Sequence, residues 1–301
     1  METDRSIVTY NLSKKYPGTN KFALKGLDLD VHKGEVYGYL GPNGAGKSTT
    51  IRLLMNFIQP TAGEAKINGY DSVSESTEAK SQVGYLAGEL SLYPKMTGWQ
   101  FLDYMASLQP PKRTGYRKEL ARRFKAELNK KISELSKGNR QKVGIIQAFM
   151  HEPDILILDE PTSGLDPLMQ EEFFALVRET KKRGASLFIS SHNLTEVQKM
   201  CDKVGFIREG KLIAEQSIND FSDGSVQTYD ISFATPAPID ELRRIPHAKI
   251  RKNTDHYITI KLRGSLKPLF QILARHKVNS IDRRDLSLEE EFLEFYRGKK
   301  V

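Results

Sequence analysis

The chain has 301 residues, of which 39% are hydrophobic and 28% are charged, and its formal net charge is +8. This composition excludes an intrinsically disordered chain, which would combine few apolar residues with strongly unbalanced charge. No run of about 18 apolar residues occurs and residues 1–4 are polar, so we expect neither a membrane-spanning helix nor a signal peptide. The length favours one large domain and one smaller domain.

Short apolar segments alternate with amphipathic segments through the first two thirds of the chain. Strands are predicted at residues 6–10, 27–31, 35–40, 83–86, 155–158, 186–190, 203–208 and 211–215. Helices are predicted at residues 50–57, 99–108, 116–129, 138–150, 167–182 and 194–200. Because strands and helices alternate, we predict an α/β core built on a parallel sheet.

The pattern changes after residue 221, where the linker-like segment Ser222-Asp223-Gly224-Ser225 follows. Beyond it, strands are predicted at residues 226–233, 248–251, 257–262 and 278–283, and helices at residues 239–244, 267–276 and 288–296. The order β-α-β-β-α-β is that of a ferredoxin-like α+β domain. We therefore predict two domains, residues 1–221 and residues 222–301.

The strand predicted at residues 35–40 runs into a glycine-rich loop, and a helix follows. The loop consists of Gly41, Pro42, Asn43, Gly44, Ala45, Gly46, Lys47, Ser48 and Thr49. Glycines let successive backbone N–H groups point at phosphates, and the helix adds its positive N-terminal end. Lys47 would contact the β- and γ-phosphates, and the Ser48 hydroxyl would coordinate Mg²⁺. A P-loop by itself does not distinguish this chain from GTPases, kinases and helicases.

Two carboxylates, Asp159 and Glu160, follow the fully apolar segment 155–158. Ligands of a parallel α/β sheet bind at the carboxyl ends of its strands. Considered alone, such a pair would more often cap a helix or form a turn. Together with the P-loop, it predicts a phosphoryl-transfer site in which Asp159 holds Mg²⁺ and Glu160 polarises the attacking water.

Across residues 6–221 a series of motifs resembles the ATP-binding cassette (ABC) family. Gly41–Thr49 resembles the Walker A motif, and residues 155–159 followed by Glu160 resemble the Walker B motif. Two further segments resemble the signature motif and the D-loop of the family. The first consists of Leu135, Ser136, Lys137, Gly138 and Asn139, and the second of Ser163, Gly164, Leu165 and Asp166. His192 resembles the switch histidine, and Tyr16 resembles the aromatic residue that stacks on adenine.

The resemblance implies a P-loop NTPase cassette: a mixed-sheet core, an antiparallel β subdomain and a helical subdomain at about residues 89–151. It also implies an ATPase that uses ATP and Mg²⁺, with Lys47, Glu160 and His192 as catalytic residues. Two cassettes, identical or sister, would pair head to tail around two ATP molecules. Ser136 and Gly138 lie at the start of a predicted helix, so each subunit would offer a helix N-terminus to the γ-phosphate held by the other.

Two departures from the usual motifs are informative. Lys137 and Asn139 stand where a glycine and a glutamine are usual, and this variant resembles the bacitracin and multidrug export (ABC-2 type) branch. A glutamine is also usual after residues 83–86, where this chain has Ala87, Gly88 and Glu89. Glu89 is therefore a further candidate ligand of Mg²⁺.

The excess positive charge is concentrated in residues 112–142, which contain 12 Lys/Arg and 3 Asp/Glu, a local excess of 12 − 3 = +9. Such a segment could be a solvated helical face, or it could contact nucleic acid, a membrane surface or an acidic partner. The resemblance favours an exporter subunit, peripheral on the cytoplasmic face of the cell membrane, that drives a separate integral membrane permease. The alternatives are a soluble ABC ATPase acting on nucleic acid or ribosomes, and a regulatory cassette without turnover.

Overall fold

The computed structural model describes residues 4–218, 227–246, 248–252, 254–262 and 265–284. The chain forms two compact units, Met1–Gln216 and Ser217–Val301. The predicted boundary after residue 221 and the helix predicted at residues 288–296 lie outside the described residues, so both stay predictions. Among the described residues, no helix is both long enough and apolar enough to span a membrane.

The first unit contains two sheets. Its antiparallel sheet, in the order β2-β1-β4-β5, consists of β1 (Arg5–Lys15), β2 (Phe22–His32), β4 (Ala62–Ile67) and β5 (Tyr70–Asp71). The second sheet, in the order β10-β9-β3-β8-β7-β6, consists of β3 (Val36–Leu40), β6 (Val83–Leu86), β7 (Ile155–Asp159), β8 (Ser186–Ser191), β9 (Lys203–Arg208) and β10 (Lys211–Ser217). The predicted parallel sheet is present, because β6, β7, β8, β3 and β9 are parallel neighbours. Every residue of β3, β7 and β8 is buried, as expected for strands covered on both faces.

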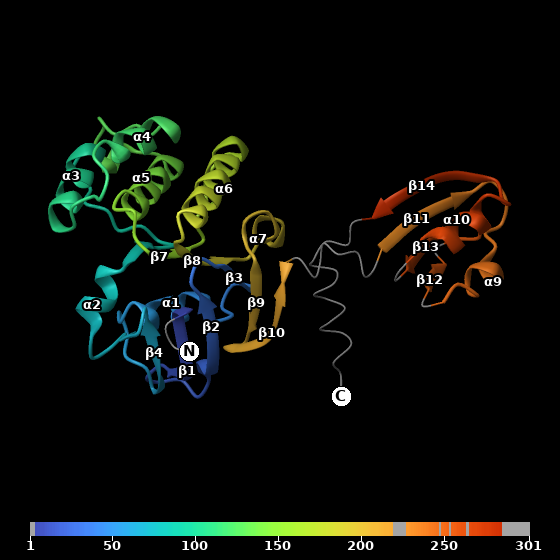
Figure 1. Cartoon of the computed structure of the whole chain (residues 1–301), viewed down its shortest axis with the longest axis horizontal. Coiled ribbons are helices and arrows are strands. Elements are labelled where there is room, and N and C mark those ends of the chain that lie inside the picture. The colour runs from blue at the N-terminus through green and yellow to red at the C-terminus, as the bar shows by residue number, and fades with distance from the viewer. Residues whose placement is uncertain (1–3, 219–226, 247, 253, 263–264, 285–301) are drawn as a thin grey trace. The chain divides into compact units, whose positions relative to one another are not determined.

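Seven α-helices are described in this unit. They are α1 (Lys47–Leu54), α2 (Ser76–Ser81), α3 (Gly98–Leu108), α4 (Tyr116–Arg123), α5 (Lys137–Phe149), α6 (Pro167–Lys182) and α7 (Leu194–Met200). In Figure 1, α3, α4 and α5 form a group on one side of the six-stranded sheet, with α6 beside it. The helix predicted at 116–129 is wrong in its second half. It ends at Arg123, because Lys125 adopts a left-handed backbone conformation with φ 49°.

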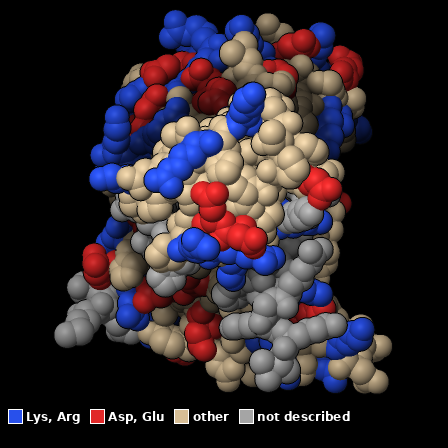
Figure 2. All heavy atoms as spheres, turned by 90° about the vertical axis from the view of Figure 1, so that its right-hand side faces the viewer, with Lys and Arg blue, Asp and Glu red and all other residues tan. Residues whose placement is uncertain are grey.

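The described residues of the second unit form a four-stranded antiparallel sheet and two helices. The strands, in the order β12-β13-β11-β14, are β11 (Gln227–Phe233), β12 (Lys249–Lys252), β13 (Tyr257–Leu262) and β14 (Val278–Arg284), and the helices are α9 (Ile239–Leu242) and α10 (Lys267–Leu273). The predicted β-α-β-β-α-β order is present. Ile231, Phe233, Ile260 and Leu269 are fully or almost fully buried in its core. On the face of the molecule shown in Figure 2, charged side chains of both signs surround an area with few charges.

Candidate functional site

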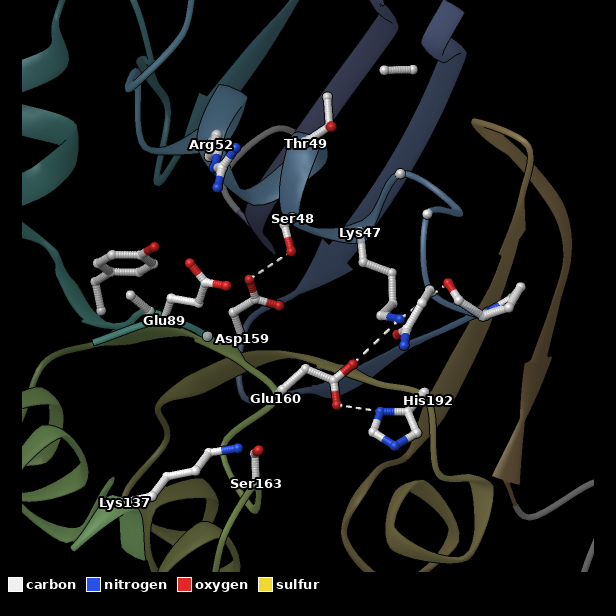
Figure 3. Close-up of a pocket in the computed structure, with 18 residues that line it drawn as sticks. Lys47, Ser48, Thr49, Arg52, Glu89, Lys137, Asp159, Glu160, Ser163 and His192 are labelled. Atoms are coloured by element: carbon white, nitrogen blue, oxygen red, sulfur yellow. Dashed lines mark hydrogen bonds and ion pairs between the residues drawn. The ribbon is translucent and has the colours of Figure 1, made fainter. Parts of the chain in front are cut away.

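A cleft with a volume of about 660 Å³ lies at the carboxyl ends of β3, β6, β7 and β8, beside the N-terminus of α1 (Figure 3). This is the edge of the sheet at which ligands of parallel α/β folds bind. The lining residues are Ala23, Pro42, Asn43, Gly44, Gly46, Lys47, Ser48, Thr49, Arg52, Tyr85, Ala87, Gly88, Glu89, Lys137, Asp159, Glu160, Ser163 and His192. Residues from five of the predicted motifs therefore meet in one cleft.

The glycine-rich loop is packed so closely that its first and last glycines have no room for a side chain. A Cβ atom on Gly41 would lie 2.3 Å from the Ile207 carbonyl oxygen. Gly46 has φ 114°, and a Cβ atom there would lie 2.7 Å from the Ala23 carbonyl oxygen. Gly46 also directly precedes α1, so the loop and the positive end of the helix both border the cleft.

The ammonium group of Lys47 lies next to this loop, and the Lys47 side chain is only 6% exposed. Its Nζ donates hydrogen bonds to the carbonyl oxygens of Gly41 at 2.6 Å and Pro42 at 3.3 Å. The same Nζ lies 3.3 Å from Glu160 Oε1. The ammonium group is thus held between the loop and the carboxylate that follows β7, where it can contact an anion bound by the loop.

Ser48 and Asp159 bring two side-chain oxygens together in the cleft. Ser48 Oγ donates to Asp159 Oδ2 at 2.9 Å, and Ser190 Oγ donates to Asp159 Oδ1. A Cβ atom on Gly88 would lie 3.1 Å from Asp159 Oδ2, so the 87–89 segment passes close to this carboxylate. Among the described residues, no cluster of three His, Cys, Asp or Glu side chains forms a metal site of its own. A hydroxyl and one carboxylate fit Mg²⁺, which protein sites hold through few ligands together with substrate phosphates.

Glu160 has a backbone conformation that is unusual for a non-glycine residue, with φ 50°. Its N–H donates to the Ser190 carbonyl oxygen at 3.2 Å and to Ser190 Oγ at 3.1 Å. Its carboxylate Oε2 lies 2.6 Å from His192 Nδ1. Strained backbone conformations of this kind are concentrated at functional sites, where surrounding contacts enforce them.

Gln141, on α5, helps to hold this turn and was not predicted. The side chain is 3% exposed, and its Nε2 donates to the Pro161 carbonyl oxygen at 2.8 Å. Gln141 shares the buried face of α5 with Ile145 and Ala148. A polar residue at an apolar position of a helix was therefore the sequence signal that could have identified it.

The signature and D-loop segments lie against each other within one chain. A Cβ atom on Gly138 would lie 2.7 Å from the Gly164 carbonyl oxygen, and the Lys137 stem passes 3.5 Å from the Cβ position of Gly164. Ser136 caps α5 by accepting from the Asn139 N–H, and Asp166 caps α6 by accepting from the Met169 N–H. Leu135 and Leu165 are buried. Of these two motifs, only Lys137 and Ser163 line the cleft of their own chain.

Tyr16 lies beside the end of the glycine-rich loop, outside the set of residues that line the cleft. Its ring is half-buried, and its hydroxyl oxygen is 3.5 Å from Thr49 Oγ1. The lining residues Ala23, Arg52 and Tyr85 were not predicted. Burial raises the pKa of Tyr85 to about 12, with a further rise from the Asp159 charge and a smaller opposing effect of Arg52. Tyr85 is therefore a neutral phenol at physiological pH.

A family model and two bacterial ATP-binding proteins of transporters are similar to this chain. A family model described as ABC transporter matches residues 24–163. The ABC transporter ATP-binding protein NatA of Bacillus subtilis is 37% identical over 197 residues, which cover 64% of this chain and 80% of NatA. The bacitracin transport ATP-binding protein BcrA of Bacillus licheniformis is 37% identical over 212 residues, which cover 69% of each protein.

Solved structures agree with these relatives. An ATP-binding subunit of an ABC transporter is 31% identical, with a TM-score of 0.66 over 72% of this chain and 91% of that chain. A dimeric MJ0796 cassette bound to ADP and Pi shares the fold at 23% identity, with a TM-score of 0.64 over 70% of this chain and 98% of that chain. The matched relatives and the cleft confirm the predicted fold and family: the chain belongs to the ABC transporter ATP-binding proteins, a family of ATPases.

Proposed function

We propose that the chain is the ATP-hydrolysing motor subunit of an ABC exporter whose permease is a separate polypeptide. The observation that carries this proposal is the single cleft in which Lys47, the Ser48–Asp159 pair and the Glu160–His192 pair meet. A loop for phosphates, oxygen ligands for a divalent cation and a candidate general base are the parts that phosphoryl transfer to water needs.

The nucleotide phosphates would lie on the loop Gly41–Thr49, with Lys47 contacting the β- and γ-phosphates. Ser48 and Asp159 would hold Mg²⁺. Glu89, which is exposed and lines the same cleft, is a further candidate ligand. When bound, Mg²⁺ neutralises charge on the β- and γ-phosphate oxygens. The Tyr16 ring, next to Thr49, would stack on the adenine.

Glu160 would act as the general base of hydrolysis. Its carboxylate accepts a proton from the attacking water while the water oxygen bonds to the γ-phosphorus, and ADP leaves. His192 is 2.6 Å from this carboxylate, so it can orient Glu160 and contact the γ-phosphate. The strained backbone at residue 160, held by Ser190, supports a fixed position for the base.

Two cassettes, identical or sister, would close head to tail over two ATP molecules. Ser136 and Gly138 stand at the N-terminus of the 13-residue helix α5, which can bind the γ-phosphate held by the other subunit. The dimeric state of the MJ0796 cassette supports this arrangement. ATP would then join the two subunits, and hydrolysis would release them.

The names of two relatives support a role in transport. BcrA is a bacitracin transport protein, and the probable multidrug protein YbhF of Escherichia coli is 36% identical over 67% of this chain and 36% of YbhF. The chain would bind a permease at the cytoplasmic face of the membrane. Purification of the tagged chain from cells in mild detergent tests this proposal. We expect a polytopic membrane protein to co-purify after nuclease treatment, whereas co-purification of RNA or ribosomes would support the nucleic-acid alternative instead.

Ion pairs within the chain engage several of the cations in the basic segment 112–142. Five of its cations form ion pairs within the chain, which are Lys112–Asp154, Arg113–Glu119, Arg117–Asp103, Arg123–Glu172/Glu179 and Lys130–Glu127. Lys118 and Arg122 are exposed one helical turn apart on α4. We propose that these two side chains face the permease or the anionic headgroups beside it.

Reversal of both charges, in Lys118→Glu/Arg122→Glu, should weaken membrane recruitment by at least roughly 30-fold. Each basic residue near an anionic membrane surface contributes about 1 kcal/mol, and reversal adds repulsion. Membrane sedimentation of the chain measures the effect. Lys21→Glu/Lys33→Glu, which reverses two exposed cations on either side of β2, is the matched control. Equal recruitment of the two double variants would contradict this role of α4.

A further inference from the structure

One arginine joins the helical group α3–α5 to helix α6. Arg123 is the last residue of α4, and its side chain is 17% exposed. Its Nε donates to Glu172, while Nη1 and Nη2 donate to Glu179 Oε2 and Oε1 at 2.5 and 2.9 Å. Such a two-pronged contact to one carboxylate fixes direction as well as distance. Because Arg123 is engaged with α6, it is not one of the exposed cations of the basic segment 112–142.

The two helices that Arg123 joins are each connected to one of the two motifs that meet near the cleft. Helix α4 packs on α5, whose N-cap is Ser136. Helix α6 starts directly after the D-loop, with Asp166 as its N-cap. Along α6, Glu172 and Glu179 lie roughly 9 and 20 Å from that cap, at about 1.5 Å per residue. Arg123 therefore acts on the same two bodies as the Gly138–Gly164 contact, but at a distance from it.

The Gly138–Gly164 contact is one of several that join these two bodies. Gly138 approaches the Gly164 carbonyl oxygen without a side chain, so the two segments touch there through backbone. Farther along α6, the edge-on contact of the Phe149 and Phe173 rings joins α5 to α6, and Arg123 adds a directional polar contact between α4 and α6. The pKa of Glu179 is lowered by the hydrogen bond from Arg123, so this contact remains ionised across the physiological pH range.

We infer that Arg123 is a positioning residue for the nucleotide-binding surface that this chain offers to a second subunit. By tying α4 to α6 through Glu172 and Glu179, it sets the orientation of Ser136 and Gly138 relative to the D-loop. The inference rests on the proposed head-to-tail dimer. It does not involve the chain's own glycine-rich loop, whose contacts Arg123 does not share.

The test uses the full chain carrying Glu160→Gln, in which ATP binding and dimer formation can be measured without turnover. Arg123→Lys keeps the charge but cannot form the two-pronged contact. Arg117→Lys is the matched control, because Arg117 lies on the same helix and pairs with Asp103 on α3, within the helical group. We expect Arg123→Lys to raise the chain concentration for half-maximal ATP-dependent dimerisation by roughly 5- to 150-fold, the usual range for coupled sites. ATP affinity of the dilute monomer and the control should be unchanged.

Two further variants separate positioning from folding. Glu172→Gln/Glu179→Gln should reproduce the defect, and Arg123→Glu/Glu172→Gln/Glu179→Arg, which reverses the pair, should restore dimerisation at least in part. Normal dimerisation of Arg123→Lys, or a loss of monomer ATP affinity in parallel with dimerisation, would overturn the inference. If the Glu160→Gln parent itself fails to dimerise with ATP, the proposed head-to-tail dimer is wrong, an outcome distinct from a failure of Arg123 alone.

Discussion

Replacement of Glu160 by glutamine should reduce ATP turnover by about 10²- to 10⁴-fold, the range that general acid–base catalysis contributes. The amide keeps the size of the side chain but cannot accept the proton of the attacking water. ATP affinity should persist, because the loop Gly41–Thr49, Lys47 and the Ser48–Asp159 pair remain in place. The ATP-bound dimer should therefore accumulate. Steady-state phosphate release, equilibrium nucleotide binding and size-exclusion chromatography measure the three effects.

Glu209→Gln is a matched control for this variant. Glu209 has the same left-handed backbone conformation, with φ 50°, and its side chain is 82% exposed outside the cleft. The control should retain turnover, which separates loss of the carboxylate at residue 160 from a general effect of the substitution on a strained turn. Undiminished hydrolysis by Glu160→Gln would remove this residue from the mechanism and leave His192 as the remaining candidate base.

The residues at the sheet edge could be predicted from the sequence because their positions follow from one rule. Lys47, Asp159 and His192 lie at or beyond the carboxyl ends of three different strands, and the carboxyl ends of parallel strands meet at the same edge. The structure places all three on the cleft. The burial of Lys47 and Asp159 also had a local signal, since apolar strand segments precede both residues.

No such rule predicts contacts between elements that are not neighbours in the sheet. The sequence shows Arg123 only as one cation in a basic stretch, and it does not show which of the chain's 38 acidic residues it meets. The early end of α4 was missed for a related reason. Lys125 takes a left-handed conformation that is usual for glycine or asparagine, so no helix-ending residue marked the site. The helical periodicity of residues 116–129 predicted continuation instead.

Replacement of Lys47 by alanine should produce the opposite pattern to Glu160→Gln, because it removes binding rather than chemistry. Hydrogen bonds to charged groups contribute about 1.5–3 kcal/mol, so the Kd for ATP should rise by roughly 10- to 150-fold. The loss should be larger for ATP than for ADP, since Lys47 would contact the γ-phosphate as well as the β-phosphate. Equilibrium binding of both nucleotides to the purified chain measures this difference.

The buried position of Lys47 gives this prediction a structural control. Its ammonium lies between the Gly41 carbonyl oxygen and the Glu160 carboxylate, so truncation leaves both without that donor. A loss of ATP binding caused by collapse of the loop would also lower the unfolding temperature, whereas loss of a phosphate contact would not. Adding Glu160→Gln to Lys47→Ala removes the uncompensated carboxylate charge. If the double variant binds ATP as tightly as Glu160→Gln alone, repulsion by Glu160 explains the defect and Lys47 has no direct contact with the phosphates.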